Sequence, residues 1–174
     1  MSISVLIVDD HAIVRSGLRS MLAGEDVEIV GEALDGNQAL EQTLALNPDV
    51  ALLDIRMQKA DGLSALQKIR KESPETRVII LSMYDNPTYV ARSVVLGAKD
   101  YVLKDSSRQV LLERIRNVAS DKPTTEDSIL RSVRETMEQR KNVQSGFPLT
   151  KRELQVLRHI ALGLSNREIG ASLG

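Results

Sequence analysis

Five polar side chains end or follow four apolar runs, and their types are those that handle phosphoryl groups. They are Asp9 and Asp10 after residues 3–8, Asp54 at the end of 49–54, Ser82 after 77–81, and Lys104 after 100–103. Carboxylate oxygens suit Mg²⁺, and an ionised carboxylate can also attack phosphorus as a nucleophile. A hydroxyl and an ammonium can bind the anionic oxygens of a phosphoryl group. The set therefore predicts Mg²⁺-dependent phosphoryl transfer to Asp54.

This chemistry requires that the four runs end at one edge of a sheet. Short apolar runs alternate with helical patterns of apolar residues. The expected strands are 3–8, 27–30, 49–54, 77–81 and 100–103, and the expected helices are 11–23, 36–46, 63–71, 89–96 and 110–119. Five β-α units with short loops predict a parallel sheet with helices on both faces, class α/β. Right-handed crossovers leave few topologies, and we expect the order 2-1-3-4-5, in which strands 1 and 3 are neighbours and ligands bind at the carboxyl ends.

Each of these residues also has a purely structural interpretation. An aspartate after a strand often caps the next helix, which would account for Asp9 and Asp10. Lys104 alone would be a solvated lysine, Ser82 a turn residue, and Tyr101 a packing residue of a strand. The chemical interpretation depends on their conjunction at one edge of the sheet.

Composition narrows the class of protein. The chain has 174 residues, 42% of them hydrophobic but only 2% aromatic, so its core must be aliphatic. The absence of cysteine excludes disulfides, thiolate nucleophiles and cysteine-based zinc sites. The formal net charge of -1 does not indicate a polyanion-binding protein. The sequence has no signal-peptide pattern and no apolar stretch of membrane-spanning length, so we expect a soluble cytoplasmic protein that does not bind membranes.

The chain divides into three parts. Residues 1–120 contain the β-α units. Residues 121–146 form a polar linker with one amphipathic helix, whose narrow apolar stripe predicts weak docking or pairing with a second copy. Residues 147–174 contain two capping boxes, one starting at Thr150 and one at Ser165, and they predict two short helices joined at Gly163.

The first part resembles the receiver domain of two-component response regulators, over residues 3–119. The motifs that carry the resemblance are Val8-Asp9-Asp10-His11, Leu53-Asp54 with Met57 and Asp61-Gly62, Leu81-Ser82, and the run from Gly97 to Asp105. The resemblance implies a flavodoxin-like (βα)5 fold and makes Asp54 the phosphoacceptor. By the same resemblance, Lys104 contacts the phosphoryl group, and Asp9, Asp10, Asp54 and the backbone carbonyl of Arg56 hold Mg²⁺.

The resemblance also implies a switch pair, Ser82 and Tyr101. Tyr101 would rotate inward when Ser82 turns toward the phosphoryl group. Arg56 and Tyr84 lie two residues past Asp54 and Ser82, and they are candidates for controlling water access to the acyl phosphate. The family commonly has proline where this chain has Gln58, a departure that affects the stiffness of the loop and not the chemistry.

The last part resembles the first two helices of a LuxR-type helix-turn-helix domain, as in the NarL/FixJ type of response regulator. In that family the helix that reads bases would follow residue 174, so we expect no specific DNA binding by this chain alone, although the intact protein would bind DNA. Lys151, Arg152 and Arg167 could contact DNA phosphates, but exposed basic residues are more often a solvated surface.

The expected function is that of a regulator and not an enzyme. A sensor histidine kinase would phosphorylate Asp54, and the added charge would control dimerisation and DNA binding, with helices 11–23 and 110–119 as the dimer surface implied by the resemblance. One alternative is a receiver that acts through protein contacts alone. Another is an aspartate-nucleophile phosphatase, which would need an acid at the position of Arg56.

Overall fold

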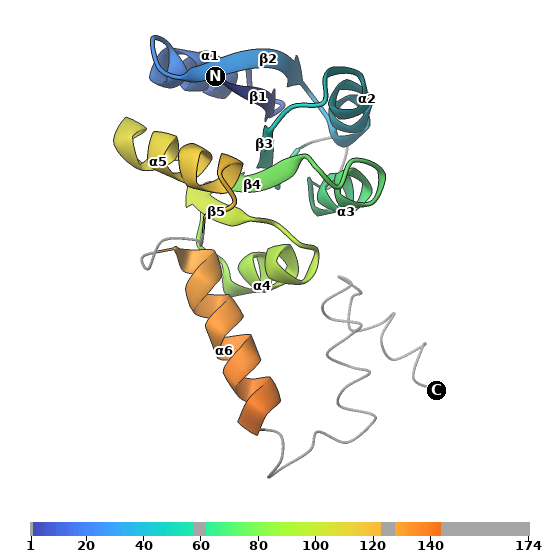
Figure 1. Ribbon diagram of the computed structural model, residues 1–174, viewed down its shortest axis with the longest axis vertical. Coiled ribbons are helices and arrows are strands. Elements are labelled where there is room, and N and C mark those ends of the chain that lie inside the picture. Colours follow the sequence, from blue (N-terminus) through green and yellow to red (C-terminus); the bar gives the residue numbers. More distant parts are fainter. Residues whose placement is uncertain (1, 58–61, 123–127, 144–174) are drawn as a thin grey trace.

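The computed structural model describes residues 2–57, 62–122 and 128–143, which form an α/β fold around one five-stranded parallel sheet (Figure 1). The strands are β1 Ile3–Val8, β2 Val27–Ala33, β3 Val50–Asp54, β4 Arg77–Ser82 and β5 Asp100–Leu103. The helices are α1 Ala12–Leu22, α2 Gly36–Leu46, α3 Gly62–Glu72, α4 Pro87–Val95, α5 Arg108–Ala119 and α6 Ile129–Val143. The sheet order β2-β1-β3-β4-β5 confirms the prediction and brings β1 beside β3.

Two aliphatic clusters fill the faces of the sheet. One cluster lies between one face of the sheet and the helices α1 and α5. It contains buried side chains of β1, β3 and β4, together with Leu22 and Ile115, which are almost fully buried. The other lies under α2, α3 and α4, with Leu66 and Val90 fully buried. Since β3 is buried along its whole length, it provides a rigid support for the residue at its end.

The predicted boundaries differ from the observed ones mainly in β2 and α4. β2 continues to Ala33, because β1 pairs with it through Val8. α4 begins at Pro87 instead of residue 89, because the side chain of Asn86 accepts a hydrogen bond from the backbone N–H of Thr88. A proline at the first position of a helix removes only an N–H that would have no helical partner. Gly97 follows the helix at φ 87°, the left-handed conformation in which glycine commonly ends a helix.

The linker helix α6 packs against α4 and β5 (Figure 1). Leu130 is fully buried there, and Ile129 and Val133 pack against the same cluster. The narrow apolar stripe predicted either weak docking or pairing with a second copy, and the structure shows the first of these, with the stripe packed on the sheet domain itself. The cause is a complementary surface on α4 and β5, which the stripe alone does not reveal.

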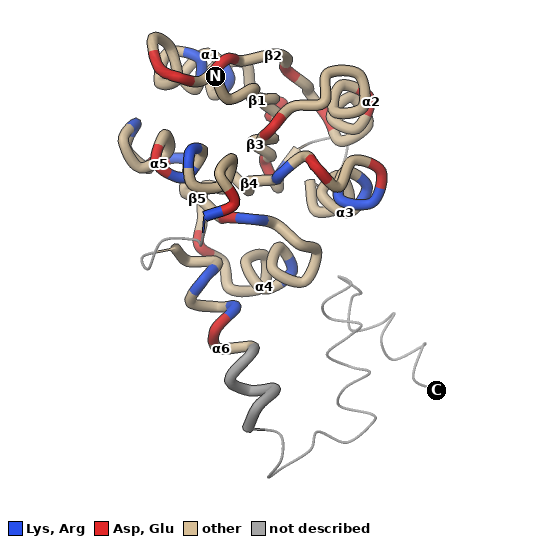
Figure 2. The backbone as a smooth tube through the Cα atoms, viewed as in Figure 1, with Lys and Arg blue, Asp and Glu red and all other residues tan. Residues whose placement is uncertain are grey.

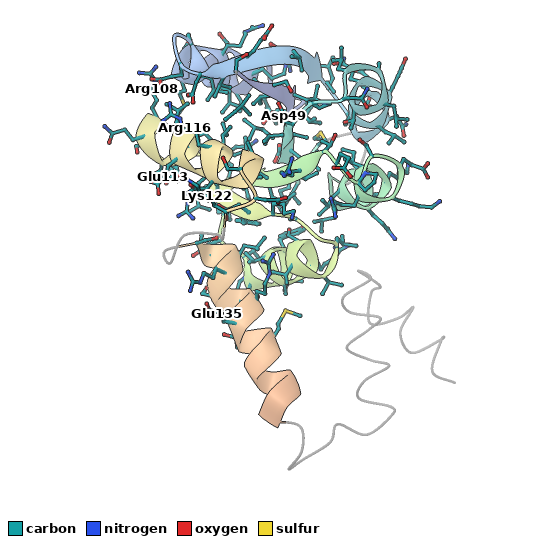
Figure 3. All side chains as sticks on the ribbon, in the orientation of Figure 1. Asp49, Arg108, Glu113, Arg116, Lys122 and Glu135 are labelled. Carbon is teal, nitrogen blue, oxygen red and sulfur yellow. The ribbon has the colours of Figure 1, made fainter. Side chains whose placement is uncertain are left out.

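Ion pairs join α5 to the loop that precedes β2. Arg108 and Arg116 extend from α5 toward the loop before β2 (Figure 3), where both pair with Glu25. Elsewhere in the described residues, Figure 2 shows Lys and Arg interspersed with Asp and Glu along the chain. None of the described helices is both long and apolar enough to cross a membrane.

Candidate phosphoryl-transfer site

Asp54 ends β3 at the carboxyl edge of the sheet, and only 3% of its surface is exposed. Its Oδ1 accepts a hydrogen bond of 3.1 Å from the backbone N–H of Arg56. This bond fixes the side chain, so that the carboxylate points along the edge and not into the apolar interior.

Gly62 closes the loop that follows Asp54. Its N–H donates to the carbonyl of Ile55, and a Cβ at this position would lie 2.0 Å from the carbonyl oxygen of Asp54. No side chain fits in that space, so glycine is the only residue that lets α3 begin so close to β3.

Lys104 connects β5 to the acids of β1 and β3. Its Nζ lies 2.8 Å from Oδ2 of Asp54 and 2.7 Å from Oδ2 of Asp9. The backbone N–H of Lys104 donates to the carbonyl of Ser82, which holds the lysine at this edge of the sheet. The structure thus places the side chain of Lys104 among the acids at this edge of the sheet, where it is 8% exposed.

The pKa shifts of Asp54 and Lys104 follow from their burial and from their ion pairs. Burial raises the pKa of Asp54 and outweighs the opposing effect of the Lys104 ammonium. For Lys104, burial alone would lower the pKa, but hydrogen bonds and charge attraction to Asp54 and Asp9 outweigh it, so the pKa of Lys104 is raised. The lysine therefore stays charged at neutral pH.

The acidic doublet lies beside Asp54. Asp9 is fully buried, and its Oδ1 accepts a hydrogen bond from the backbone N–H of His11. His11 is the N-cap residue of α1, so neither Asp9 nor Asp10 occupies the capping position that the structural interpretation gave them.

These carboxylates form a group that fits a divalent cation. Asp9, Asp10 and Asp54, together with His11, each offer one ligand atom, and these atoms all lie within 4.8 Å of one another. Oxygen ligands in this number suit Mg²⁺, which retains several waters. His11 is the member to which the sequence pattern assigned no role. Its Nδ1 lies 2.7 Å from Oδ1 of Asp10, and its position directly after the doublet was the available signal.

Ser82 and Tyr101 share one hydrogen-bond acceptor. The Ser82 hydroxyl donates to the carbonyl of Tyr84 at 2.9 Å, and the Tyr101 hydroxyl donates to the same oxygen at 2.7 Å. Tyr101 is 3% exposed, and burial raises the pKa of its hydroxyl. The resemblance implied that Tyr101 turns inward when the phosphoryl group arrives; in this structure the ring is already inward, while Ser82 bonds to Tyr84.

A small pocket of about 60 Å³ opens beside Ser82. Arg56 and Tyr84 both line it, and the guanidinium carbon of Arg56 lies 5.9 Å from the centre of the Tyr89 ring. Both residues thus border a space beside Ser82 and Ile55, next to the end of β3. Since Arg56 occupies the position where an aspartate phosphatase would have its second acid, the phosphatase alternative lacks its general acid.

Three further predictions lie outside the described residues. They are the loop at Gln58, the parts of the linker at residues 123–127 and 144–146, and the helix-turn-helix unit 147–174 with its basic residues Lys151, Arg152 and Arg167.

Comparison with known proteins gives matches along nearly the whole chain. The family model "Response regulator receiver domain" matches residues 5–116, and the model "Bacterial regulatory proteins, luxR family" matches residues 147–174. The response regulator protein VraR of Staphylococcus saprophyticus is 36% identical over 173 residues, which cover 99% of this chain and 82% of that protein.

Two solved structures are also similar. A chain in the structure of two RcsB dimers bound to two parallel DNAs has a TM-score of 0.70 and 26% identity, over 99% of this chain and 83% of that chain. A chain in the CheX–CheY–BeF3–Mg²⁺ complex from Borrelia burgdorferi has a TM-score of 0.63 and 31% identity, over 67% of this chain and 88% of that chain.

Proposed function

Since the chain belongs to the response regulators that join a receiver domain to a LuxR-type DNA-binding domain, we propose that Asp54 is its phosphoacceptor and that Lys104, Ser82, Asp9 and Asp10 serve the transfer. The observation that carries the proposal is the contact of Lys104 with both Asp54 and Asp9, because it gathers the ends of β1, β3 and β5 around one buried carboxylate.

The chemistry is an in-line displacement. A carboxylate oxygen of Asp54 attacks the phosphorus of a phosphohistidine on a sensor histidine kinase. The new O–P bond forms as the P–N bond breaks, and the histidine nitrogen takes up a proton. Lys104 then pairs with the phosphoryl oxygens, and the Ser82 hydroxyl turns from the carbonyl of Tyr84 toward one of them.

The residues that would hold Mg²⁺ are Asp9, Asp10 and Asp54, with the backbone carbonyl of Arg56 and waters completing the set. The bound ion supplies positive charge that offsets the carboxylates and the phosphoryl oxygens. The acids contribute by lying within 4.8 Å of one another, so that folding itself assembles the site.

The charge that phosphorylation adds at Asp54 controls transcription. Phosphorylation adds about -1.5 to -2 charges at a site that Lys104 alone does not balance. The resulting shift of Ser82 changes the loop that leads into α4, and through it the dimerisation of the chain and the position of the LuxR-type unit. The LuxR-type unit is the part that contacts DNA, and the protein acts as a regulator rather than by repeated turnover.

The test is phosphorylation of the purified chain with phosphoramidate and Mg²⁺, followed by intact mass spectrometry. We expect the mass of one phosphoryl group to be added to the parent and none to the Asp54→Asn variant. Asp49→Asn is the matched control, because Asp49 precedes the same strand at its opposite end (Figure 3). Labelling of Asp54→Asn at the parental level would refute the assignment.

A further inference from the structure

All four hydrogen-bonding groups of Asp9 have a partner in the structure. Its Oδ1 accepts the backbone N–H of His11 at 2.8 Å, and its Oδ2 lies 2.7 Å from Nζ of Lys104. Its backbone N–H donates to the carbonyl of Ala33 at 3.1 Å, and its own carbonyl accepts a bond of 3.0 Å from Nη1 of Arg15. The first three partners belong to the turn, the site and the sheet, whereas the fourth is a side chain of α1.

The guanidinium of Arg15 is itself held by β2. Its Nε donates to Oε2 of Glu32 at 2.8 Å, and only 14% of the arginine side chain is exposed. The backbone carbonyl of Glu32 accepts a bond of 2.6 Å from Nε2 of Gln42 in α2. Because a guanidinium is planar and its N–H donors have fixed directions, the contacts with Glu32 and with the carbonyl of Asp9 together determine its position.

Two links therefore attach the turn after β1 to the end of β2. The direct link is the bond from the N–H of Asp9 to the carbonyl of Ala33. The second link runs from the carbonyl of Asp9 through Arg15 to Glu32, the residue that precedes Ala33. The carbonyl of Asp9 belongs to the peptide that joins Asp9 to Asp10, so Arg15 holds the peptide between the two acids of the doublet in one orientation.

We propose that Arg15, anchored by Glu32, is a positioning residue of the Mg²⁺ site, which orients the peptide between Asp9 and Asp10 and so the carboxylates on either side of it. This inference rests on the proposed function, which assigns the two acids to Mg²⁺. Replacing a residue that supports metal ligands typically weakens metal binding by about ten- to a hundredfold. Because Arg15 bonds to the main chain of a ligand residue, we expect the lower end of this range.

Arg19 provides a matched control in the same helix. Its Nη1 lies 2.5 Å from Oε1 of Glu32, so Arg15 and Arg19 share one acidic partner. Arg19 lies one helical turn further along α1, and its side chain is 54% exposed. Arg15→Met and Arg19→Met each remove one positive charge and one ion pair with Glu32. A difference in Mg²⁺ binding between the two variants therefore reports the bond to Asp9 and not the loss of charge.

The first test titrates the full-length chain with MgCl2 and follows the amide chemical shifts of the folded protein. We expect Arg15→Met to bind Mg²⁺ about tenfold more weakly than the parent, and Arg19→Met to bind it as the parent does. Unchanged or tighter binding by Arg15→Met, or equal losses in the two variants, would overturn this inference alone. Absence of Mg²⁺ binding in the parent would contradict the proposed function and this inference with it.

The second test separates the position of the acids from the stability of the fold. Arg15→Lys keeps the charge that pairs with Glu32, but it has one nitrogen where arginine contacts Glu32 and Asp9 with two. We expect its urea midpoint to be close to that of the parent, while its Mg²⁺ binding is as weak as that of Arg15→Met. Parental Mg²⁺ affinity in Arg15→Lys would show that the charge suffices, and would overturn the proposal.

The third test asks whether β2 is the anchor. Glu32→Gln removes the charge that holds Arg15, so we expect it to weaken Mg²⁺ binding in the parent and to have no further effect in Arg15→Met, where the link to Asp9 is already broken. Glu28→Gln is the control on the same strand, since Glu28 lies near its start and accepts a bond from Ser2. An equal loss from Glu32→Gln in both backgrounds would contradict the role of Glu32 as the anchor.

Discussion

The ammonium of Lys104 pairs with the carboxylate of Asp54 at 2.8 Å, and both side chains are almost entirely buried. A pair in this position has two consequences. It favours the ionised form of the acceptor against the effect of burial and orients its carboxylate, and it makes the stability of the domain depend on charge balance at the site.

Replacement of Lys104 tests that dependence. Lys104→Met leaves Asp54 and Asp9 facing each other without a cation, and we expect a loss of about 3 kcal/mol in the free energy of unfolding. Mg²⁺ should restore part of the loss, because a cation again separates the acids. Urea denaturation with and without Mg²⁺ gives both values. Lys99→Met, which removes a surface pair with Asp121, should cost less than about 1 kcal/mol; equal losses in the two variants would contradict the argument.

The raised pKa of Asp54 predicts a pH dependence of stability. Because the folded state holds the proton more tightly than the unfolded chain, the favourable contribution is complete below the ordinary value of 3.8 and is lost as pH rises through the raised pKa. Asp54→Asn avoids this loss, so without divalent cations it should be at least as stable as the parent at pH 7. In urea titrations, the difference in free energy of unfolding between Asp54→Asn and the parent should grow above pH 3.8 and then level off.

Asp49→Asn should show the opposite sign. Hydrogen bonds from Ser4 lower the pKa of Asp49, so its contribution is present above the ordinary pKa and is lost as pH falls. The variant should therefore lose stability at pH 7. If the stability of Asp49→Asn and that of Asp54→Asn changed with pH in the same direction, the pH dependence would arise elsewhere in the protein.

Gly62 and Gly17 make a matched pair for the loop after β3. Gly62→Ala places a Cβ 2.0 Å from the carbonyl oxygen of Asp54, so the backbone must shift; we expect a cost of about 1–3 kcal/mol and weaker phosphorylation. Gly17 lies inside α1 with open space at its Cβ position, and Gly17→Ala should stabilise by about 0.5–1 kcal/mol. Thermal unfolding compares the two, and a tolerated Gly62→Ala would mean that the loop is less constrained than its contacts indicate.

The hydroxyl of Tyr101 contributes one hydrogen bond to the loop before α4. Tyr101→Phe removes the donor to the carbonyl of Tyr84, which keeps its bond from Ser82, so the expected loss is about 1 kcal/mol. Tyr84→Phe leaves that carbonyl in place and changes a side chain that is 62% exposed, so its stability should match the parent. Chemical denaturation measures the stability of both variants. Identical midpoints for Tyr101→Phe and Tyr84→Phe would contradict the hydrogen bond from Tyr101 to the carbonyl of Tyr84.

Asp121 provides a test on the surface. Hydrogen bonds from Arg77 and Lys99 lower its pKa from 3.8 to about 2. Its stabilising contribution is thus present above pH 3.8 and disappears as pH falls toward 2. A ¹³C titration of the carboxyl group should show this low midpoint, and 1 M salt should move it upward because the pairs are exposed. A midpoint at the ordinary value would mean that these contacts do not form in solution.

The sheet and its polar edge followed from local patterns, and the attachment of the linker did not. A buried run such as residues 49–54 predicts a strand, and the carboxyl ends of parallel strands lie at one edge, so Asp54 and Lys104 were expected at the same edge of the sheet. The stripe on α6 gives only the side of the helix that is apolar. Which surface receives it depends on Asp100, Ser128 and Arg114, three residues whose types suggest nothing until the fold brings them together.

The inward position of the Tyr101 ring could not be predicted from the sequence either. A tyrosine in a strand can pack on either side of its own backbone, and the choice depends on the carbonyl of Tyr84 and on the neighbouring helices. His11 was overlooked for a simpler reason: its role comes from lying 2.7 Å from Asp10, a distance that only the turn after β1 determines.

The bond between Lys104 and Asp9 joins residues that are 95 positions apart in the chain. During synthesis on the ribosome, the acids therefore emerge well before the lysine that balances them. A nascent chain that ends before β5 carries the carboxylates without their counter-charge, so its half-made domain gains its ion pair only when the last strand is released from the exit tunnel.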